Sequence, residues 1–193
     1  MINIEAQRIS LFTDKTKCSA CYACINICSM NAIVMKKDSQ GFMYPEINRS
    51  LCIECGMCEK VCNYRKQDNK GNKPKLSYAA ILKNQDVLQR SASGGAFMAL
   101  AECVLDDKGV VFGCAMNFRN GNLFPEHIMV ENKKDLISLQ GSKYVQSDIG
   151  KSFQEAKKFL CAGRQVLFSG TPCQIDGLLG YLGKKYDNLF TID

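Results

Sequence analysis

The sequence predicts two domains of different class, a small cysteine-rich α+β domain followed by a larger α/β domain. Eight of the twelve cysteines lie within the first 66 residues. Residues 67–75 then contain no apolar side chain and include glycine and proline, which is typical of a linker. Beyond them, apolar runs alternate with segments of helical periodicity, the pattern of an α/β domain. We therefore place the domains at residues 1–66 and 78–193, with a linker at 67–77.

The cysteines of the first domain form two identical runs. Each has the spacing C-x2-C-x2-C-x3-C, and the runs begin at Cys18 and Cys52. This spacing is that of bacterial ferredoxins, in which three cysteines of a run bind one 4Fe-4S cluster and the fourth binds the other. The predicted ligands are Cys18, Cys21, Cys24 and Cys62 for cluster 1 and Cys52, Cys55, Cys58 and Cys28 for cluster 2. We therefore expect a ferredoxin-like domain that transfers single electrons.

Zinc is the alternative for these cysteines, because C-x2-C pairs also build zinc knuckles and ribbons. A structural zinc site takes its four ligands as two pairs, whereas each run here supplies four cysteines and the second run repeats the first. The sequence therefore favours iron–sulfur clusters. The proline that often follows the fourth cysteine is replaced by Ser29 and Asn63, which leaves the ligands unchanged. Few apolar residues remain, so the clusters are expected to supply most of the folding energy here.

Charge and hydropathy exclude several classes of function. The formal net charge is +6, and two oxidised clusters at about −2 each reduce it to roughly +2. Lysines and arginines occur as scattered pairs, not as a stripe with aromatic residues, so we expect no nucleic-acid partner. The first residues do not resemble a secretion signal, and the charge-free stretch at 18–35 contains four cysteines. We expect a cytoplasmic protein with no membrane span, whose partner is a redox protein or a small electron donor.

The apolar pattern predicts the following elements. In the first domain, residues 32–37 and 41–47 are expected to form two short strands around a polar turn. In the second, strands are expected at 78–82, 110–116, 127–131, 165–168 and 188–192, and helices at 96–106, 133–139, 148–160 and 173–182. Right-handed crossovers would make the sheet largely parallel. Because the chain stops after a strand that normally lies inside such a sheet, we expect a fragment with an incomplete α/β domain.

Three turns of small residues each lead into a helix, at 91–95, 141–147 and 170–174. Free N–H groups and the positive end of a helix make such turns suitable for phosphate. Each turn taken alone is also typical of ordinary helix capping. Together, on one α/β domain, they favour a nucleotide-type cofactor.

The second domain resembles the coenzyme F420 hydrogenase/dehydrogenase beta subunits, a family of iron–sulfur flavoproteins. The resemblance extends from about residue 78 to residue 193, and its motifs are Ser91–Phe97, Gly109–Gly113, Leu139–Ser147 and Leu167–Ile175. Family members with a two-cluster domain at the N-terminus are similar to the chain from end to end. The resemblance implies FAD bound by Ser93, Gly94, Gly95, Gly141, Ser142, Lys143, Tyr144 and Ser147. Lys143 would neutralise the pyrophosphate or the reduced flavin, and Tyr144 would stack on a ring.

The remaining cysteines and the single histidine are treated separately. Cys173 follows Thr171 and Pro172 at the start of a helix, a position that favours a thiolate ligand or nucleophile. In the family it resembles one ligand of a further 4Fe-4S cluster, whose other ligands would lie beyond residue 193, so we expect an unpaired thiol here. Cys103, Cys114 and Cys161 are predicted to be buried small apolar residues, and His127 is given no role.

The leading hypothesis is an oxidoreductase that links a two-electron donor to a one-electron acceptor through FAD and two 4Fe-4S clusters. The resemblance implies reduced coenzyme F420 as the donor, with ferredoxin or a nicotinamide as substitutes. The alternative is an electron carrier, in which the α/β domain only docks the ferredoxin-like domain to a partner enzyme. A structural zinc protein is the third possibility. No catalytic residue is assigned.

Overall fold

The computed structural model describes residues 9–12, 14–65 and 76–193. These residues divide into two compact units. The cluster unit contains the described residues up to Arg65 and also Asp176–Gly183, and the α/β unit contains Leu76 to Ile175 and Lys184–Asp193. Most of the predicted linker, residues 67–75, lies outside the described residues. The predicted domain boundaries therefore stay a prediction.

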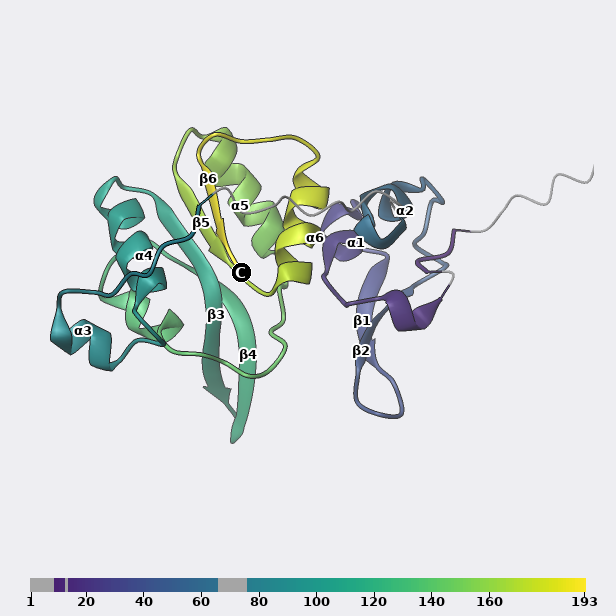
Figure 1. The fold of residues 1–193 in the computed structure, drawn as a ribbon. Helices are drawn as coiled ribbons and strands as arrows, with labels where there is room; N and C mark the ends of the chain where they lie inside the picture. The colour runs from purple at the N-terminus through teal and green to yellow at the C-terminus, as the bar shows by residue number, and fades with distance from the viewer. Residues whose placement is uncertain (1–8, 13, 66–75) are drawn as a thin grey trace, which may run out of the picture. The chain divides into compact units, whose positions relative to one another are not determined.

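The cluster unit is built from short elements. In chain order they are η1 (Lys15–Lys17), α1 (Ala23–Ile27), β1 (Ile33–Lys37), β2 (Met43–Ile47), α2 (Met57–Val61) and η2 (Asn63–Arg65) (Figure 1). Strands β1 and β2 pair antiparallel, from Ile33 opposite Ile47 to Lys37 opposite Met43. The carboxylate of Asp38 closes their turn by accepting hydrogen bonds from the N–H groups of Gln40 and Phe42, both at 3.0 Å. The hairpin predicted from the sequence is confirmed.

The cysteine repeat is also a repeat of backbone conformation. Ala20 and Glu54, at equivalent positions of the two runs, have φ of 52° and 53°. The next equivalent pair, Tyr22 and Gly56, has φ of 66° and 71°, and each residue caps the short helix that follows. Left-handed conformations are costly for residues other than glycine. Their recurrence shows that both runs fold around the same kind of backbone loop.

The apolar core of the cluster unit is small. One buried cluster consists of Ile9, Ile33 and Cys58, with partly buried isoleucines and cysteines packed against it. The other buried apolar residues between Cys18 and Arg65 are mostly small: Ala20, Tyr22, Ala23, Ala32 and Val61. Several large apolar side chains of this unit, Phe42 and Ile53 among them, are exposed instead. Protein side chains alone therefore bury little apolar surface, which agrees with a fold that depends on bound clusters.

The α/β unit contains a four-stranded sheet. Its elements are α3 (Gln85–Gln89), α4 (Ala96–Asp106), β3 (Val110–Arg119), β4 (Asn122–Val130), η3 (Asp135–Leu139), α5 (Ser152–Cys161), β5 (Val166–Ser169), the start of α6 (Pro172–Leu182) and β6 (Leu189–Ile192). The strand order is β4-β3-β5-β6. Strands β3, β5 and β6 are parallel to one another. The α/β class predicted from the sequence is confirmed.

Strand β4 departs from the predicted parallel sheet. It pairs antiparallel with β3 over nine residue pairs, from Val111 opposite Val130 to Arg119 opposite Asn122. Only Asn120 and Gly121 separate the two strands, with φ of 50° and 79°. An Asn-Gly pair with two positive φ angles is the preferred two-residue hairpin turn. The prediction of a largely parallel sheet is therefore wrong for β4, and the turn that causes this was present in the sequence.

The strand predicted at residues 78–82 is not formed. The structure shows no ladder there, and Tyr78 is 83% exposed. The segment is held instead by a hydrogen bond from the N–H of Leu82 to the carbonyl of Gly94, at 2.9 Å. An apolar run with no partner strand cannot satisfy its backbone as a sheet. Residues 78–82 therefore form an extended loop that lies against the turn before α4.

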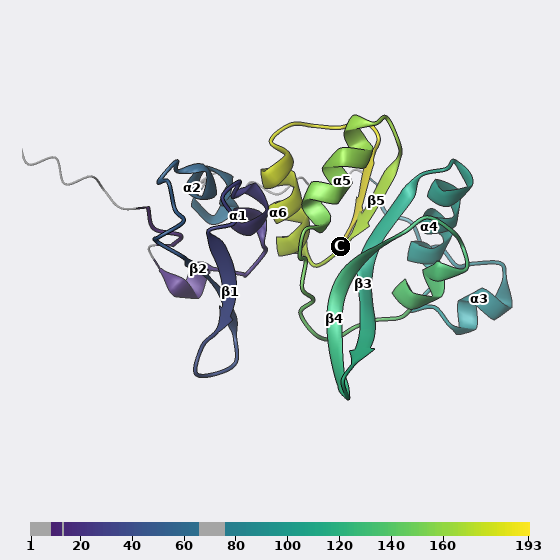
Figure 2. The same cartoon turned by 180° about the vertical axis from the view of Figure 1, so that it is seen from behind.

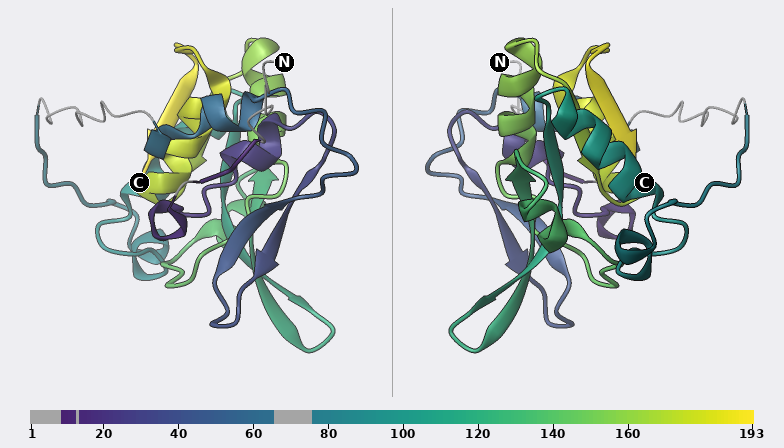
Figure 3. Two further views of the ribbon diagram at one scale, coloured as in Figure 1. Left: turned by 90° about the vertical axis from the view of Figure 1, so that its right-hand side faces the viewer. Right: turned by 90° about the vertical axis from the view of Figure 1, so that its left-hand side faces the viewer.

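Helices cover both faces of this sheet (Figures 1 and 2). On one face, α4 and η3 pack on Val111, Ala115 and Leu167. On the other face, Phe153 of α5 contacts Phe168, which stacks on Phe112 at a ring separation of 5.4 Å. Strands β3 and β4 run on as a two-stranded arm beyond the last residues that pair with β5 (Figure 3). The carboxyl end of β5 therefore lies beside the middle of β3, and the largest part of the candidate cofactor site is built there.

Candidate cluster and cofactor sites

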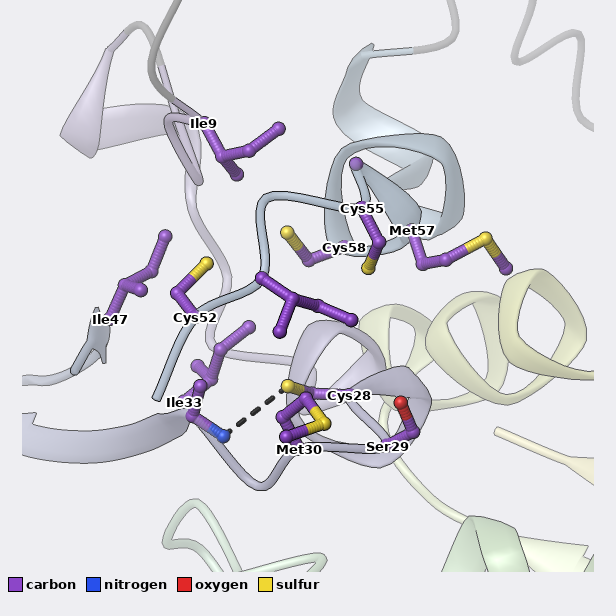
Figure 4. Close-up of a pocket in the computed structure, with 13 residues that line it drawn as sticks. Ile9, Cys28, Ser29, Met30, Ile33, Ile47, Cys52, Cys55, Met57 and Cys58 are labelled. Carbon is purple, nitrogen blue, oxygen red and sulfur yellow. Dashed lines mark hydrogen bonds between the residues drawn. The ribbon is translucent and has the colours of Figure 1, made fainter. Parts of the chain in front are cut away.

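The first cysteine pocket contains all four predicted ligands of cluster 2. Cys52, Cys55 and Cys58 come from the second run and Cys28 from the end of the first run. Their sulfur atoms point into the pocket from its two sides (Figure 4). The rest of the lining is mostly apolar and includes Ile33. The N–H of Ala32 donates a hydrogen bond to the Sγ of Cys28 at 3.3 Å, a contact that stabilises a ligating thiolate.

The second cysteine pocket contains all four predicted ligands of cluster 1. Cys18, Cys21 and Cys24 line it together with Cys62 from the end of the second run. Cys58 also reaches this pocket, and the aromatic side chains of Phe12, Tyr22 and Tyr64 form part of its wall. The crossed arrangement of fourth cysteines is thus the one the ferredoxin spacing predicts. The assignment of individual ligands stays a prediction.

The electrostatics of these pockets suit a positively charged metal core. Burial raises the pKa of the Cys18, Cys24 and Cys58 thiols. Neighbouring cysteines raise the pKa of Cys24 further. Thiolates gathered in a partly buried space therefore need a cation, and the irons of a 4Fe-4S cluster supply one to every sulfur. Four cysteines around one cavity fit that group.

A third pocket lies in the α/β unit, at the carboxyl end of β5. Its volume is about 440 Å³. All three turns singled out in the sequence contribute to its wall, with Gly95 from the first, Lys143 from the second and Gly170 from the third. In open α/β sheets, ligands bind at the carboxyl ends of parallel strands. The structure therefore brings together three segments that are distant in the sequence, the first and last of them, at Gly95 and Gly170, being about 75 residues apart.

Five of the eight residues implied for FAD line this pocket and three do not. The five are Gly95, Gly141, Ser142, Lys143 and Ser147. Tyr144 is 99% exposed, so its ring is directed away from the pocket. Gly94 contacts the extended loop instead, because a Cβ there would lie 2.2 Å from the carbonyl oxygen of Ala80. Ser93, with φ of 51°, shapes the turn. The roles of all eight toward a cofactor stay a prediction.

Lys143 provides positive charge in the pocket wall. Its Nζ donates to the carbonyl oxygens of Gln140 at 2.9 Å and Ser138 at 3.3 Å, which fixes the side chain. Burial lowers the pKa of Lys143, and the nearby Cys114 acts in the opposite direction. This ammonium is partly desolvated and forms no ion pair with a carboxylate of the described residues, so it is well suited to an anionic ligand.

Among the polar residues of the pocket, Cys114 and His127 were given no role toward a cofactor from the sequence, and Gln174 entered only as the last residue of the 170–174 turn. His127 and Gln174 are buried polar side chains, 8% and 1% exposed. Cys114 lies opposite His127 in the β3–β4 ladder, and burial raises the pKa of its thiol against the effects of Lys143 and Ser147. The strand alternation that places Phe112 in the core also directs Cys114 to the same face. That alternation was the available signal for Cys114, while nothing in the sequence links His127 to its partners.

The other cysteines differ from the prediction in part. Cys103 and Cys161 are exposed and Cys114 is half-buried, so the expectation of three buried cysteines is wrong. Cys103 falls on the outer side of α4, whose inner side is formed by Met98, Ala101 and Leu105. Cys173 is half-buried near the start of α6, and its Sγ lies 3.1 Å from the Oγ1 of Thr171. Its proposed role in a third cluster stays a prediction.

The fold and these pockets define an iron–sulfur electron-transfer domain joined to an α/β domain with a candidate cofactor site. Comparison with known protein families supports this description of the two domains. Residues 17–66 match the 4Fe-4S dicluster domain, and residues 77–154 match the coenzyme F420 hydrogenase/dehydrogenase beta subunit, N-terminal family. The resemblance seen in the sequence is confirmed, in the same order along the chain. The chain thus combines an iron–sulfur domain with a region similar to an oxidoreductase subunit.

One curated relative is similar to most of the chain. The uncharacterized protein MJ1349 of Methanocaldococcus jannaschii is 23% identical over 205 aligned residues, which cover 91% of this chain. The chain spans 56% of the length of that relative.

In the part of the chain that the structure describes, no helix is long and apolar enough to cross a membrane.

Proposed function

We propose that this chain is an iron–sulfur flavoprotein oxidoreductase module. In the proposal FAD binds in the pocket at the end of β5, and two 4Fe-4S clusters bind in the two cysteine pockets. The observation that carries it is the convergence of three small-residue turns and Lys143 on one pocket, in a chain that also builds two cysteine-lined pockets. The proposal includes a reducing cytoplasm, which suits clusters and free thiols.

The chain's own residues have distinct tasks in this proposal. The eight cysteines of the two runs hold the clusters, and the N–H of Ala32 stabilises the thiolate of Cys28. Lys143 and the backbone of the turns at Gly95 and Gly141 neutralise and hydrogen-bond an anionic cofactor. FAD, when bound, supplies the conversion between two-electron and one-electron transfer. Ordinary N-cap chemistry does not explain the 141–147 turn, because α5 begins only at Ser152, with Lys151 as its N-cap.

The donor in the proposal is reduced coenzyme F420, because the matching family is described as a coenzyme F420 hydrogenase/dehydrogenase subunit. A nicotinamide or ferredoxin is the substitute. Each hydride brings two electrons, and each oxidised cluster accepts one of them, so two clusters per chain balance one hydride. The word "subunit" in the family description also supports a protein partner as the final acceptor.

Anaerobic reduction assays test this function. The purified chain, with and without added FAD, is mixed with reduced F420, NADPH or reduced ferredoxin, and bleaching of cluster absorbance is followed. The proposal predicts that one hydride donor reduces the clusters only when FAD is present. Reduction by ferredoxin that is equally fast without FAD, together with no reaction of either hydride donor, would instead identify an electron carrier.

A further inference from the structure

His127 occupies a central place in the wall of the α/β pocket. It is the only histidine of the chain, lies on β4, and is almost fully buried. Its ring stacks on Phe168 of β5, with centroids 5.3 Å apart and planes inclined by 15°. The residue is therefore held rigidly between the strands that end at the pocket.

Both ring nitrogens of His127 have partners on other segments. Nε2 lies 2.8 Å from the carbonyl oxygen of Ser169, the last residue of β5. Nδ1 lies 2.8 Å from the Oγ of Ser147, at the end of the 141–147 turn. Gln174 extends this chain of hydrogen bonds, because its Nε2 donates to the Oγ of Ser147 at 3.1 Å and its Oε1 accepts from the N–H of Thr171 at 3.0 Å.

These contacts define the tautomer of the ring. A carbonyl oxygen can only accept, so the nitrogen that faces Ser169 carries the hydrogen. Burial lowers the pKa of His127, which favours the neutral ring with an unprotonated Nδ1. Ser147 then donates its hydroxyl hydrogen to Nδ1 while it accepts from Gln174. The Oγ of Ser147 is thus held between His127 and Gln174.

The packing around this chain of hydrogen bonds is tight. A methyl group at Gly170 would lie 3.1 Å from the Oε1 of Gln174 and 3.5 Å from the Nε2 of His127. The N–H of Gly170 donates to the carbonyl of Ile192 on β6 at 3.0 Å. The turn after β5 therefore has little freedom on either side.

We propose that His127 is a positioning residue, which acts through Ser147 to fix the 141–147 turn against the end of β5 and so builds the pocket before its ligand binds. The inference rests on the proposed function, since it takes FAD as that ligand. It changes the role of Ser147, which holds the turn in place and does not donate to the cofactor.

Four variants of the anaerobically purified chain, with clusters in place, test this role by FAD binding. His127→Phe keeps the ring on Phe168 and removes both hydrogen bonds, and Ser147→Ala removes the donor. His127→Asn keeps an acceptor close to the position of Nδ1. Ser152→Ala is the matched control, because this buried serine donates to the backbone carbonyl of His127 at 3.3 Å but does not line the pocket.

The dissociation constant for FAD is measured by quenching of flavin fluorescence. His127→Phe and Ser147→Ala are each expected to raise it about tenfold, the effect of losing the buried hydrogen bond between Nδ1 and Ser147 that both variants share. The double variant should be no weaker than either single one, because both break the same link. His127→Asn should restore binding to within about threefold, and Ser152→Ala should leave it unchanged. Wild-type affinity in His127→Phe, or an equal loss in Ser152→Ala, would overturn the inference.

A second measurement separates this inference from the proposed function. Because the chain has one histidine, a histidine-selective 15N label reports the tautomer of His127 without FAD. The inference predicts a neutral Nε2–H ring, and faster hydrogen exchange across residues 141–147 in His127→Phe. A protonated ring at pH 7, or exchange that is unchanged in the variant, would overturn it. A chain that shows the neutral Nε2–H ring and the faster exchange in His127→Phe but binds no FAD contradicts the proposed cofactor alone.

Discussion

Cys28 and Cys52 line the same pocket although they belong to different cysteine runs. The converse holds for Cys62, which lines the other pocket with Cys18. Each pocket therefore contains three predicted ligands from one run and a fourth from the other, and Cys58 lines both pockets. With the predicted ligands, this crossing makes the two clusters interdependent, because each cluster then needs one cysteine from the other run.

The crossing predicts the outcome of two matched double substitutions. Cys28→Ala with Cys52→Ala removes two ligands of one cluster, so about four irons per chain should remain. Cys28→Ala with Cys18→Ala removes one ligand from each cluster, and the iron content should fall well below that. Iron analysis after anaerobic reconstitution measures both. The reverse order of iron contents would show that each run binds its own cluster.

Replacing Glu54 by glycine is expected to stabilise the protein. Its φ of 53° places an exposed glutamate in the left-handed region, where glycine carries no steric cost. Glu54→Gly should raise the free energy of unfolding by about 0.5–1 kcal/mol relative to Glu54→Ala, the control that removes only the carboxylate. Gly56→Ala, with φ of 71°, should lower it by about 1 kcal/mol. Urea titration of the holoprotein measures these differences, and a destabilised Glu54→Gly would contradict the account.

Cluster removal should unfold the cluster unit. Its buried core is small, so metal binding is expected to supply most of its folding free energy. Far-UV circular dichroism before and after removal of the clusters by a chelator measures this. The part of the signal that comes from the α/β unit, with its separate core, should persist. A spectrum that does not change at all would contradict the expectation.

Lys143 predicts the electrostatic part of cofactor binding. Lys143→Gln should raise the dissociation constant for FAD by about tenfold, because a charge-assisted contact to phosphate or reduced flavin is lost. Lys185→Gln is the control, since Lys185 is highly exposed and does not line the pocket. Because burial lowers the pKa of Lys143, affinity should decrease with rising pH earlier than for an ordinary lysine. Equal losses in both variants would show a general effect of charge.

His127 predicts a dependence of stability on pH. Burial lowers its pKa from the ordinary value of 6.5, and Asp148 is the nearby charge that acts in the opposite direction. Between the lowered pKa and 6.5, the unfolded chain binds a proton that the folded chain does not, so stability falls as the pH falls. The slope is at most about 1.4 kcal/mol per pH unit. It should be absent from His127→Asn, and an identical slope in that variant would assign it to other groups.

Local patterns predicted most elements because their causes lie within a few residues. The helix expected at 96–106 is observed at Ala96–Asp106, and its apolar residues face the sheet as their period requires. The cysteine pockets were equally predictable, because ligand spacing is a local property with few solutions. The antiparallel pairing of β4 follows from the Asn120-Gly121 turn, which is also a local signal. The alternation of strands and helices along the chain favoured a parallel strand instead, and that prediction was wrong for β4.

Features that depend on distant residues were not predictable. Residues 78–82 have the composition of a strand, but no neighbouring strand is available to them in the described structure. His127 acquires its place from Ser147 and Ser169, which are 20 and 42 residues away. Tyr144 has the right residue type for stacking, yet the turn directs it to solvent. In each case the conformation or contacts of the residue depend on segments that are distant in the sequence or on the path of the backbone, which local patterns do not specify.

The cofactor content of the anaerobically purified chain tests the central claim most directly. Iron, zinc and released flavin are measured in the same sample after denaturation. The account predicts about eight irons and close to one FAD per chain, with little zinc. Eight irons without flavin, even after incubation with excess FAD, would contradict the flavoprotein and leave an iron–sulfur electron carrier.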